Sequence, residues 1–302
     1  MTVRGPRPAQ ILARLAAEVR SSHARRSGGM ERGLAILATT AERRRLAWLA
    51  RLMPLPNPLA APSPPTAAAG TVVAPGARSG IRWVSPDLLR LRLAKPAGFA
   101  YRAGQSAKLG LQGLARRYSF ASAPFEPELE FFIELQAGGR MSGLLRLHAD
   151  PDAITISDIK GDLQLVPAAA DHLMVATVTG IAPFRSMVLE HLHSGGNGRR
   201  FILLHGASYQ DEFGYDAELR RLAAEHPGRL VYIPSVSRPA EPRNAGWQGA
   251  TGRVETLVDA VIDQYRLAPA TTCLYACGQP AMVRSVARAY RLQGFLVREE
   301  SY

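Results

Sequence analysis

The segment RRYSFASAP, from Arg116 to Pro124, places a cation, an aromatic ring and a hydroxyl along one extended run. In a strand, Arg116 and Tyr118 share one face, and Arg117 and Ser119 share the opposite face. The Arg116 guanidinium can bind a phosphate through two hydrogen bonds, and the Tyr118 ring, about 7 Å further along, can lie against a flat heterocycle. Ser119 can reach the edge of that heterocycle. These groups describe a flavin nucleotide site, although an ordinary strand explains this segment equally well.

Further along the chain, four motifs carry groups that could bind phosphates or nucleotides. Ser142, in LQAGGRMSGLLRL, lies where an N-cap would, and free N–H groups at a helix start bind pyrophosphate. The run VATVTGIAPFRS, residues 175–186, combines a strand, a Thr-Gly turn and a proline near a helix start, as nucleotide-binding turns do. Ser237 and Arg238 end another strand, in SVSRP, and a Cys-Gly pair ends a fourth, in YACGQPAMV. Each motif alone also has an ordinary structural explanation.

Two kinds of pattern must position these motifs. From about residue 80 to 166, short strand-like runs separated by turn residues predict an antiparallel barrel of about six strands, with a short helix around 142–147. After residue 170, strands alternate with helices, which predicts a parallel sheet that binds ligands outside the carboxyl ends of its strands. The runs of the barrel are IRWVS, LLRLRLA, SAKLGL, RRYSFAS, LEFFIEL and AITIS, and those of the sheet are HLMVATVT, RFILLHGAS, LVYIPSV, TTCLYACG and FLVREES.

Composition narrows the function classes. The chain has 302 residues and a net charge of +12, of which about +8 lies in residues 1–53, so the remainder is only mildly basic. No apolar run approaches the roughly 18–20 residues of a membrane span. The two cysteines, Cys273 and Cys277, are too few for a disulfide framework, a four-thiolate zinc site or an iron–sulfur cluster. We therefore expect a protein of a reducing, cytoplasmic compartment with no bound metal.

The order of the motifs resembles the ferredoxin–NADP reductase superfamily over residues 80–302, about three quarters of the chain. The family's RxYS motif is matched by Arg116, Tyr118 and Ser119, and its GxxS pyrophosphate loop by Gly139 to Ser142. The later matches are Thr179, Gly180, Ala182 and Pro183 for T-G-x-A-P, Cys277 and Gly278 for C-G, and Glu300 to Tyr302 for the acidic-x-aromatic ending.

This resemblance implies a flavoenzyme that holds FAD on the barrel. Arg116 would contact its phosphate, Tyr118 would lie against the isoalloxazine, and Ser119 would approach N5. Arg140, Met141 and Ser142 would line the pyrophosphate, and Tyr302 would cover the other face of the ring, where nicotinamide enters. The resemblance therefore sandwiches the ring between two phenol side chains.

The resemblance also implies residues for catalysis and for the pyridine nucleotide. Cys277 and Glu300 would border the nicotinamide and flavin N5, so the expected catalytic residues are Ser119, Cys277, Glu300 and Tyr302. Thr179, Gly180 and Gly278 would form the nucleotide turns, and Ser237, Arg238 and Arg253 would surround a 2′-phosphate, which favours NADP(H). Two residues depart from the family pattern: Val178 replaces a glycine, and Ser208 stands where NADPH-binding relatives often have arginine.

We expect three parts: a basic extension and Pro/Ala-rich linker over 1–79, an FAD-binding barrel over 80–168, and an NAD(P)-binding α/β domain over 169–302. The expected activity is FAD-dependent electron transfer between NADPH and a carrier protein, a ferredoxin or flavodoxin, by a monomeric enzyme. The alternatives are the reductase component of an oxygenase and a flavin reductase. In those cases any iron–sulfur cluster must come from a separate protein.

The family does not explain residues 1–79. Their basic, amphipathic start fits an organelle-targeting segment, an arm that binds an anionic membrane or an acidic partner, an arginine-rich appendage or a misassigned start. A function of another class is also open, in which this extension is a membrane- or protein-binding adaptor on a degenerate flavin scaffold. No feature indicates nucleic-acid binding.

Overall fold

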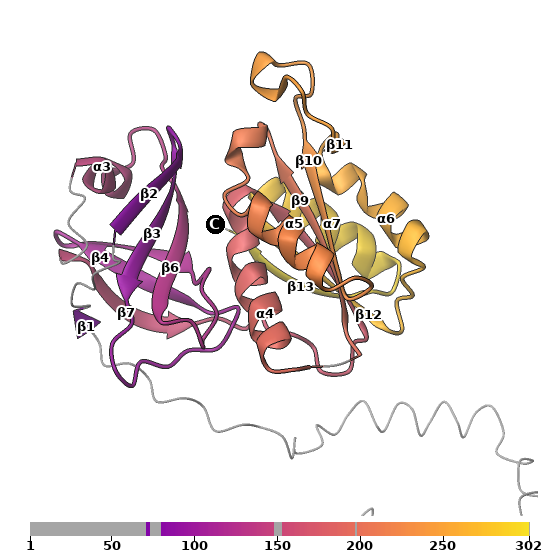
Figure 1. Cartoon of the computed structure of the whole chain (residues 1–302), viewed down its shortest axis with the longest axis horizontal. Coiled ribbons are helices and arrows are strands. Elements are labelled where there is room, and N and C mark those ends of the chain that lie inside the picture. The colour runs from indigo at the N-terminus through magenta and orange to yellow at the C-terminus, as the bar shows by residue number, and fades with distance from the viewer. Residues whose placement is uncertain (1–70, 73–79, 148–152, 197, 302) are drawn as a thin grey trace, which may run out of the picture. The chain divides into compact units, whose positions relative to one another are not determined.

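The computed structural model describes residues 71–72, 80–147, 153–196 and 198–301 (Figure 1). All of these residues belong to one compact unit, residues 63–302. Of the basic extension and linker that we predict over 1–79, only residues 71–72 are described, and they form strand β1; Tyr302 also lies outside the described residues. Within the described part, no helix is long and apolar enough to cross a membrane.

Two antiparallel sheets form the first half of the unit, as predicted (Figure 1). Their strand orders are β2-β3-β6 and β1-β7-β4-β5, and a bridge between Phe120 and Phe131 links them. Leu89, Leu91 and Leu93 alternate along β3 into the interior of this barrel, which is closed at one end by the short helix α3. The bounds are β1 (Thr71–Val72), β2 (Gly80–Ser85), β3 (Leu88–Ala94), β4 (Ser106–Leu111), β5 (Leu114–Ser119), β6 (Glu128–Glu134), α3 (Arg140–Leu147) and β7 (Thr155–Lys160).

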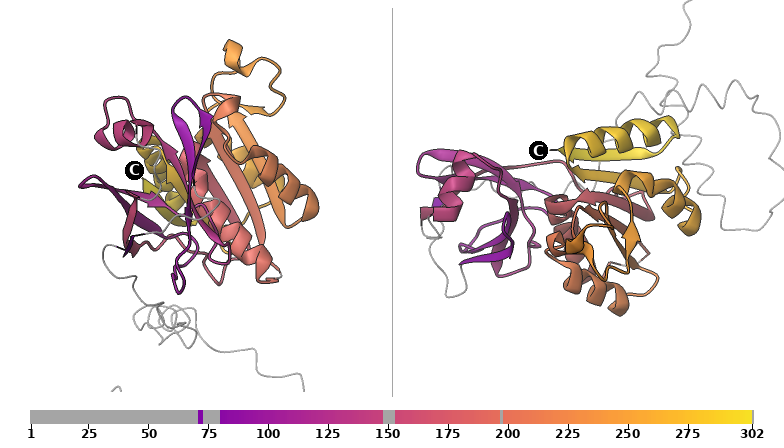
Figure 2. Two further views of the ribbon diagram at one scale, coloured as in Figure 1. Left: turned by 60° about the vertical axis from the view of Figure 1, so that its left-hand side comes forward. Right: turned by 90° about the horizontal axis from the view of Figure 1, so that it is seen from above.

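A six-stranded parallel sheet of order β11-β10-β9-β8-β12-β13 forms the second half (Figures 1 and 2). The predicted architecture, an antiparallel barrel followed by a parallel α/β part, is therefore confirmed. The strands are β8 (Asp171–Thr177), β9 (Arg200–Ala207), β10 (Leu230–Val236), β11 (Ala250–Thr251), β12 (Thr272–Gly278) and β13 (Leu296–Ser301). The helices are α4 (Ile181–His193), α5 (Asp216–Glu225), α6 (Val258–Tyr265) and α7 (Pro280–Leu292), with 3₁₀ turns η2 (Val178–Gly180), η3 (Gln210–Glu212), η4 (Pro242–Asn244) and η5 (Val254–Thr256).

Helices cover both faces of the parallel sheet because its strands are apolar on both faces. Met174 and Ala176 of β8 pack with α4 and α5, while Leu173 and Val175 pack with α6 and α7. The α4–α5 side continues into the barrel, because its core cluster includes Leu88, Ala121, Phe132 and Leu163. The two halves thus share this cluster, while the barrel interior and the α6–α7 side each have a core cluster of their own.

The strand order reverses at β8, which lies between β9 and β12. In doubly wound sheets the crevice at such a switch point, outside the carboxyl ends of the strands, is the usual ligand site. The Thr-Gly turn after β8 and the Cys-Gly pair at the end of β12 both lie there.

Local boundaries differ from the sequence patterns at several places. In the run RVETLVDAVIDQY, residues 253–265, the α-helix begins only at Val258, and Val254–Thr256 forms a 3₁₀ turn before it. The strand predicted through Ser122 ends at Ser119. Helix α3 begins at Arg140, so Ser142 lies in its first turn rather than at its N-cap, and the Ser142 hydroxyl accepts a hydrogen bond from the Gln136 N–H (2.9 Å). The two-residue strands β1 and β11 carry too few residues for a periodic signal.

Candidate functional site

A cavity of about 990 Å³ runs along the end of β5, the start of α3, the turn after β8 and the end of β13. This volume is near the upper end of the roughly 300–1,000 Å³ of small-molecule and cofactor sites. The structure brings together around it, from six separate stretches of sequence, the predicted site residues Arg116, Tyr118, Ser119, Arg140, Met141, Ser142, Thr179, Ser237, Arg253 and Glu300.

Four predicted site residues do not line this cavity: Gly180, Arg238, Cys277 and Gly278. Gly180 and Cys277 nevertheless lie against each other, because a Cβ added at Gly180 would stand 2.1 Å from the Cys277 carbonyl oxygen. Cys277 is fully buried and pairs in register with Glu300 of β13. Gly180 and Cys277 therefore pack directly behind the residues that line the cavity, while Arg238 is exposed and Tyr302 lies outside the described residues.

The end of β5 presents a buried hydroxyl to the cavity. Ser119 is 7% exposed, and its Oγ makes no hydrogen bond of normal geometry within the described part of the chain. A buried polar atom without a partner is costly unless a ligand or water supplies one. Burial also raises the pKa of Tyr118 to about 12, so its phenol stays neutral and suits stacking on a flat ring.

Arg117 is a cavity residue that the strand alternation missed. It lines the same cavity as Arg116, and its guanidinium contacts the Asp158 carboxylate and the Ser106 carbonyl (3.2 Å). The cavity reaches both faces of this strand because β5 is an edge strand of its sheet. The other lining residues that we did not predict as site residues include Phe132, Glu134, Gln136, Glu255, Gln279 and Met282.

Glu300 is the acidic group of the site. Burial raises the pKa of its carboxyl above the ordinary value, while Arg117 and Ser119 act in the opposite direction without cancelling the rise. The carboxyl consequently keeps its proton to a higher pH than an exposed glutamate does. A group of this kind, beside a cavity, can hold or release a proton during a reaction.

The donor set of the barrel side fits a flavin dinucleotide. Arg116 and Arg140 face the cavity and form no ion pair with any described carboxylate, and Gly139 precedes the first turn of α3. Free N–H groups at the start of that helix and two available cations suit a pyrophosphate. The Ser119 hydroxyl and the Tyr118 ring then suit the polar edge and the flat face of the heterocycle.

The turn after β8 is strained. Val178 has φ of 43°, in the left-handed region that a β-branched residue rarely adopts, and it lines the cavity. Burial lowers the pKa of His205 to about 4, so this histidine is neutral near pH 7. Its Nε2–H donates to the Val178 carbonyl (2.8 Å), and its Nδ1 accepts from the Tyr232 hydroxyl (3.2 Å). This buried chain of hydrogen bonds holds the turn in its strained form.

We expect Val178→Gly to be more stable than Val178→Ala by about 1 kcal/mol, because both remove the same methyl groups but only glycine adopts positive φ without strain. The measurement is the free energy of unfolding of both variants from urea titrations. Val231, half-buried in β10, provides the matched pair of substitutions. There alanine should be the more stable by about 0.5–1 kcal/mol, and the same order at both positions would contradict strain at Val178.

The predicted 2′-phosphate region contains cations with different partners. Arg238 donates to the Tyr209 hydroxyl (2.8 Å) and forms no ion pair among the described residues. Arg253 instead pairs with Glu255, at 2.6 Å between Nε and Oε1. Both Arg253 and Glu255 line the cavity.

Ser208 and Tyr209, at the end of β9, are capped by a carboxylate. Their N–H groups donate to Glu212, at 2.9 Å and 3.1 Å. The Glu212 carboxylate is therefore already used in hydrogen bonds to backbone N–H groups. Among the described residues, no group of three or more His, Cys, Asp or Glu side chains could hold a metal ion.

Comparisons with known proteins agree with this geometry. Residues 174–288 match the oxidoreductase NAD-binding domain family. The chain is 34% identical over 203 residues to the ferredoxin–NAD(P)+ reductase component of the naphthalene 1,2-dioxygenase system of Pseudomonas putida, covering 66% of this chain and 58% of that protein. It is 30% identical over 198 residues to the flavodoxin/ferredoxin–NADP reductase of Escherichia coli, covering 61% of this chain and 76% of that protein.

A solved structure shares the fold over nearly its whole length. The crystal structure of a ferredoxin NADP+ reductase from Neisseria gonorrhoeae, with bound FAD and NADP, superposes with a TM-score of 0.64 at 27% identity. It covers 74% of this chain and 97% of that one. The chain spans less than two thirds of the length of the dioxygenase reductase but most of the two ferredoxin–NADP reductases. The resemblance indicated by the five motifs is thereby confirmed, and the chain belongs to the ferredoxin–NADP reductase superfamily.

Proposed function

We propose that this chain is an FAD-dependent NAD(P)H oxidoreductase that passes electrons between NADPH and a one-electron carrier protein, a ferredoxin or flavodoxin. The supporting observation is that one cavity is lined by the Arg116–Ser119 strand, the Thr179 turn and Glu300. FAD, when bound, supplies the exchange between a two-electron hydride and single electrons. The protein supplies binding, orientation and a proton-holding group.

The residues divide into three tasks in this proposal. Arg116 binds the flavin-side phosphate, Tyr118 stacks on the ring, and the Ser119 hydroxyl approaches its polar edge. Arg140, Met141 and Ser142 line the pyrophosphate. On the nucleotide side, Thr179, Gly180 and Gly278 form the turns, Cys277 and Glu300 border the reacting centre, and Ser237, Arg238 and Arg253 bind the 2′-phosphate. Residues 80–168 and 169–302 are the corresponding flavin and nucleotide domains.

The visible absorption spectrum of the purified full-length chain tests this proposal. We expect a yellow protein whose flavin absorbance is bleached by NADPH without oxygen and restored by an oxidised ferredoxin or flavodoxin. A colourless chain that cannot take up added FAD would overturn the proposal. It would favour the hypothesis that residues 1–79 are a membrane- or protein-binding adaptor. A flavin that NADPH and NADH both fail to reduce would also overturn it.

A second candidate, the reductase component of an oxygenase, is supported by the Pseudomonas putida relative, whose name places it in a dioxygenase system. The two cysteines of this sequence cannot ligate an iron–sulfur cluster, so any such cluster would lie outside these 302 residues. Reduction rates with a Rieske-type ferredoxin and with a flavodoxin, measured side by side, distinguish the two candidates.

A further inference from the structure

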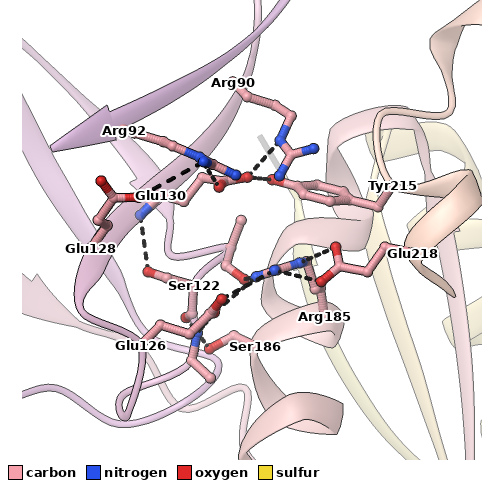
Figure 3. A network of polar contacts seen from close by, with 12 residues as sticks. Arg90, Arg92, Ser122, Glu126, Glu128, Glu130, Arg185, Ser186, Tyr215 and Glu218 are labelled. Atoms are coloured by element: carbon pink, nitrogen blue, oxygen red, sulfur yellow. Dashed lines mark hydrogen bonds and ion pairs between the residues drawn. The ribbon is translucent and has the colours of Figure 1, made fainter. Parts of the chain in front are cut away.

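A buried polar network connects the segments that follow the two predicted binding motifs (Figure 3). Ala121 and Ser122 follow Ser119 directly, and Arg185 and Ser186 lie in α4, just after the Thr-Gly turn. The Arg185 Nη1 donates to the Ala121 carbonyl (2.7 Å), and the Ser186 hydroxyl donates to the Ser122 carbonyl (2.6 Å). These hydrogen bonds therefore join the segment after the Arg116–Ser119 strand to the helix after the Thr-Gly turn, within a few residues of each motif.

Arg185 is the centre of this network. Its side chain is 4% exposed, and its guanidinium forms two hydrogen bonds with Glu218 of α5 (2.8 and 2.7 Å) and two with Glu126 of the barrel (3.0 and 3.2 Å). Burial would lower the pKa of Arg185, but Glu218 and Tyr215 reverse that effect and raise it. All five N–H donors of this planar guanidinium are used, so it holds its partners at fixed positions. The flexible ammonium of a lysine would not do so.

Tyr215 makes a second connection between the two halves. Its hydroxyl donates to Glu130 of β6 (2.6 Å), and Glu130 is held from the other side by Arg90 (2.6 Å) and Arg92 (2.7 Å). Burial alone would raise the pKa of Glu130, but its hydrogen bond with Arg90 and the nearby charges bring it down to about 2, so the carboxylate stays ionised. The guanidinium carbons of Arg90 and Arg185 lie 4.3 and 5.0 Å from the centre of the Tyr215 ring.

Close packing supports the same connection. A Cβ added at Gly214 would stand 2.6 Å from the Phe132 ring, and Phe132 lines the large cavity. The contact surface between the halves therefore reaches the wall of the proposed reaction site.

We propose that Arg185 is a positioning residue that fixes the distance between the nucleotide turn and Ser119. It acts through the polar network described above, whose other members are Arg90, Arg92, Glu126, Glu130, Ser186, Tyr215 and Glu218. The proposal rests on the proposed function. Hydride transfer requires reacting atoms about 3–3.5 Å apart, and a misplacement of about 1 Å costs about 100-fold in rate. A rigid link between the two motifs is thus a requirement of the chemistry, although Arg185 does not line the cavity itself.

The decisive variant is Arg185→Met combined with Glu126→Gln and Glu218→Gln, which removes the fork and leaves no buried charge unpaired. The rate of flavin reduction by NADPH in stopped flow should fall by about 100-fold, while the dissociation constants of FAD and NADP+ stay at parental values. The matched control is Arg221→Met with Glu225→Gln, an exposed ion pair on α5. A parental reduction rate in the triple variant, or an equal loss in the control, would overturn the proposal.

A second measurement does not depend on catalysis. Nitroxide labels at Arg82→Cys in β2 and Ser285→Cys in α7, both exposed, report the distance between the two halves by double electron–electron resonance. Cys273 and Cys277 are buried and do not compete for label. The distance distribution should be narrow in the parent and broad in the triple variant. Equal widths would overturn the proposal.

These two readouts separate failure of the proposal from failure of the proposed function. A chain that takes up no flavin would overturn the proposed function, while the label distances would still decide whether Arg185 fixes the two halves. If the triple variant does not fold, Arg185→Lys takes its place, because lysine keeps the charge and loses the fork. Its reduction rate should fall at least several-fold and its distance distribution should broaden, and parental values for both would overturn the proposal.

Discussion

Replacing Gly180 by alanine is expected to lower the rate of flavin reduction by NADPH by about 100-fold or more. The added Cβ would stand 2.1 Å from the Cys277 carbonyl oxygen and 2.6 Å from its carbon, and neither atom can move as a side chain does. The turn after β8 and the end of β12 must separate, and both border the proposed nicotinamide site. Gly180 has φ of −60°, so alanine is conformationally allowed and the effect comes from this contact alone.

Stopped-flow reduction, together with the free energy of unfolding in urea, measures this effect. Overpacking should also lower the free energy of unfolding by about 1–3 kcal/mol. Gly80→Ala is the control, because nothing lies within 4 Å of a Cβ added there, and both quantities should stay near parental values. Parental reduction by Gly180→Ala would mean that the two loops do not need their close approach.

The helices and strands of this fold can be predicted from local sequence patterns, but the long-range side-chain contacts between them cannot. The continuous apolar runs of β8, β9 and β12 predict strands buried on both faces, because each strand must face helices on two sides. Arg185, by contrast, belongs to the run APFRS, which indicates only a helix start. Its partners Glu126 and Glu218 lie 59 and 33 residues away. Pairing over such separations depends on tertiary packing, which no period in the sequence records.

The candidate site shows the same division. The motifs indicated ten of the residues that line the cavity, because a short motif carries its own backbone geometry. Arg117 was not predicted as a site residue because it lies on the face of β5 opposite Arg116 and Tyr118, whereas the cavity extends around the end of this edge strand and reaches both faces. The Glu255–Arg253 pair was missed because Glu255 belongs to no motif. The strain at Val178 was visible only as a departure from glycine, since φ is a property of the folded backbone.

Arg238→Gln should lower kcat/KM for NADPH by about 10–100-fold, because a hydrogen bond to a charged group contributes about 1.5–3 kcal/mol. The Arg238 guanidinium donates to the Tyr209 hydroxyl and forms no ion pair in the described part of the chain, so its charge is available to a dianionic 2′-phosphate. NADH has no such phosphate, and its kcat/KM should change less than about twofold. The loss should appear in KM rather than kcat, since this contact is made equally in the ground and transition states.

Glu255→Gln should have the opposite effect on NADPH. Arg253 now shares its charge with the Glu255 carboxylate at 2.6 Å, and neutralising that carboxylate both frees Arg253 and removes a negative charge beside the cavity. We expect the ratio of kcat/KM for NADPH over NADH to rise several-fold. Asp263→Asn, an exposed change on α6 that also removes one negative charge, controls for net charge and should leave the ratio unaltered. If Arg238→Gln weakened both nucleotides equally, these cations would contact a group that NADPH and NADH share, and the preference for NADPH would need another source.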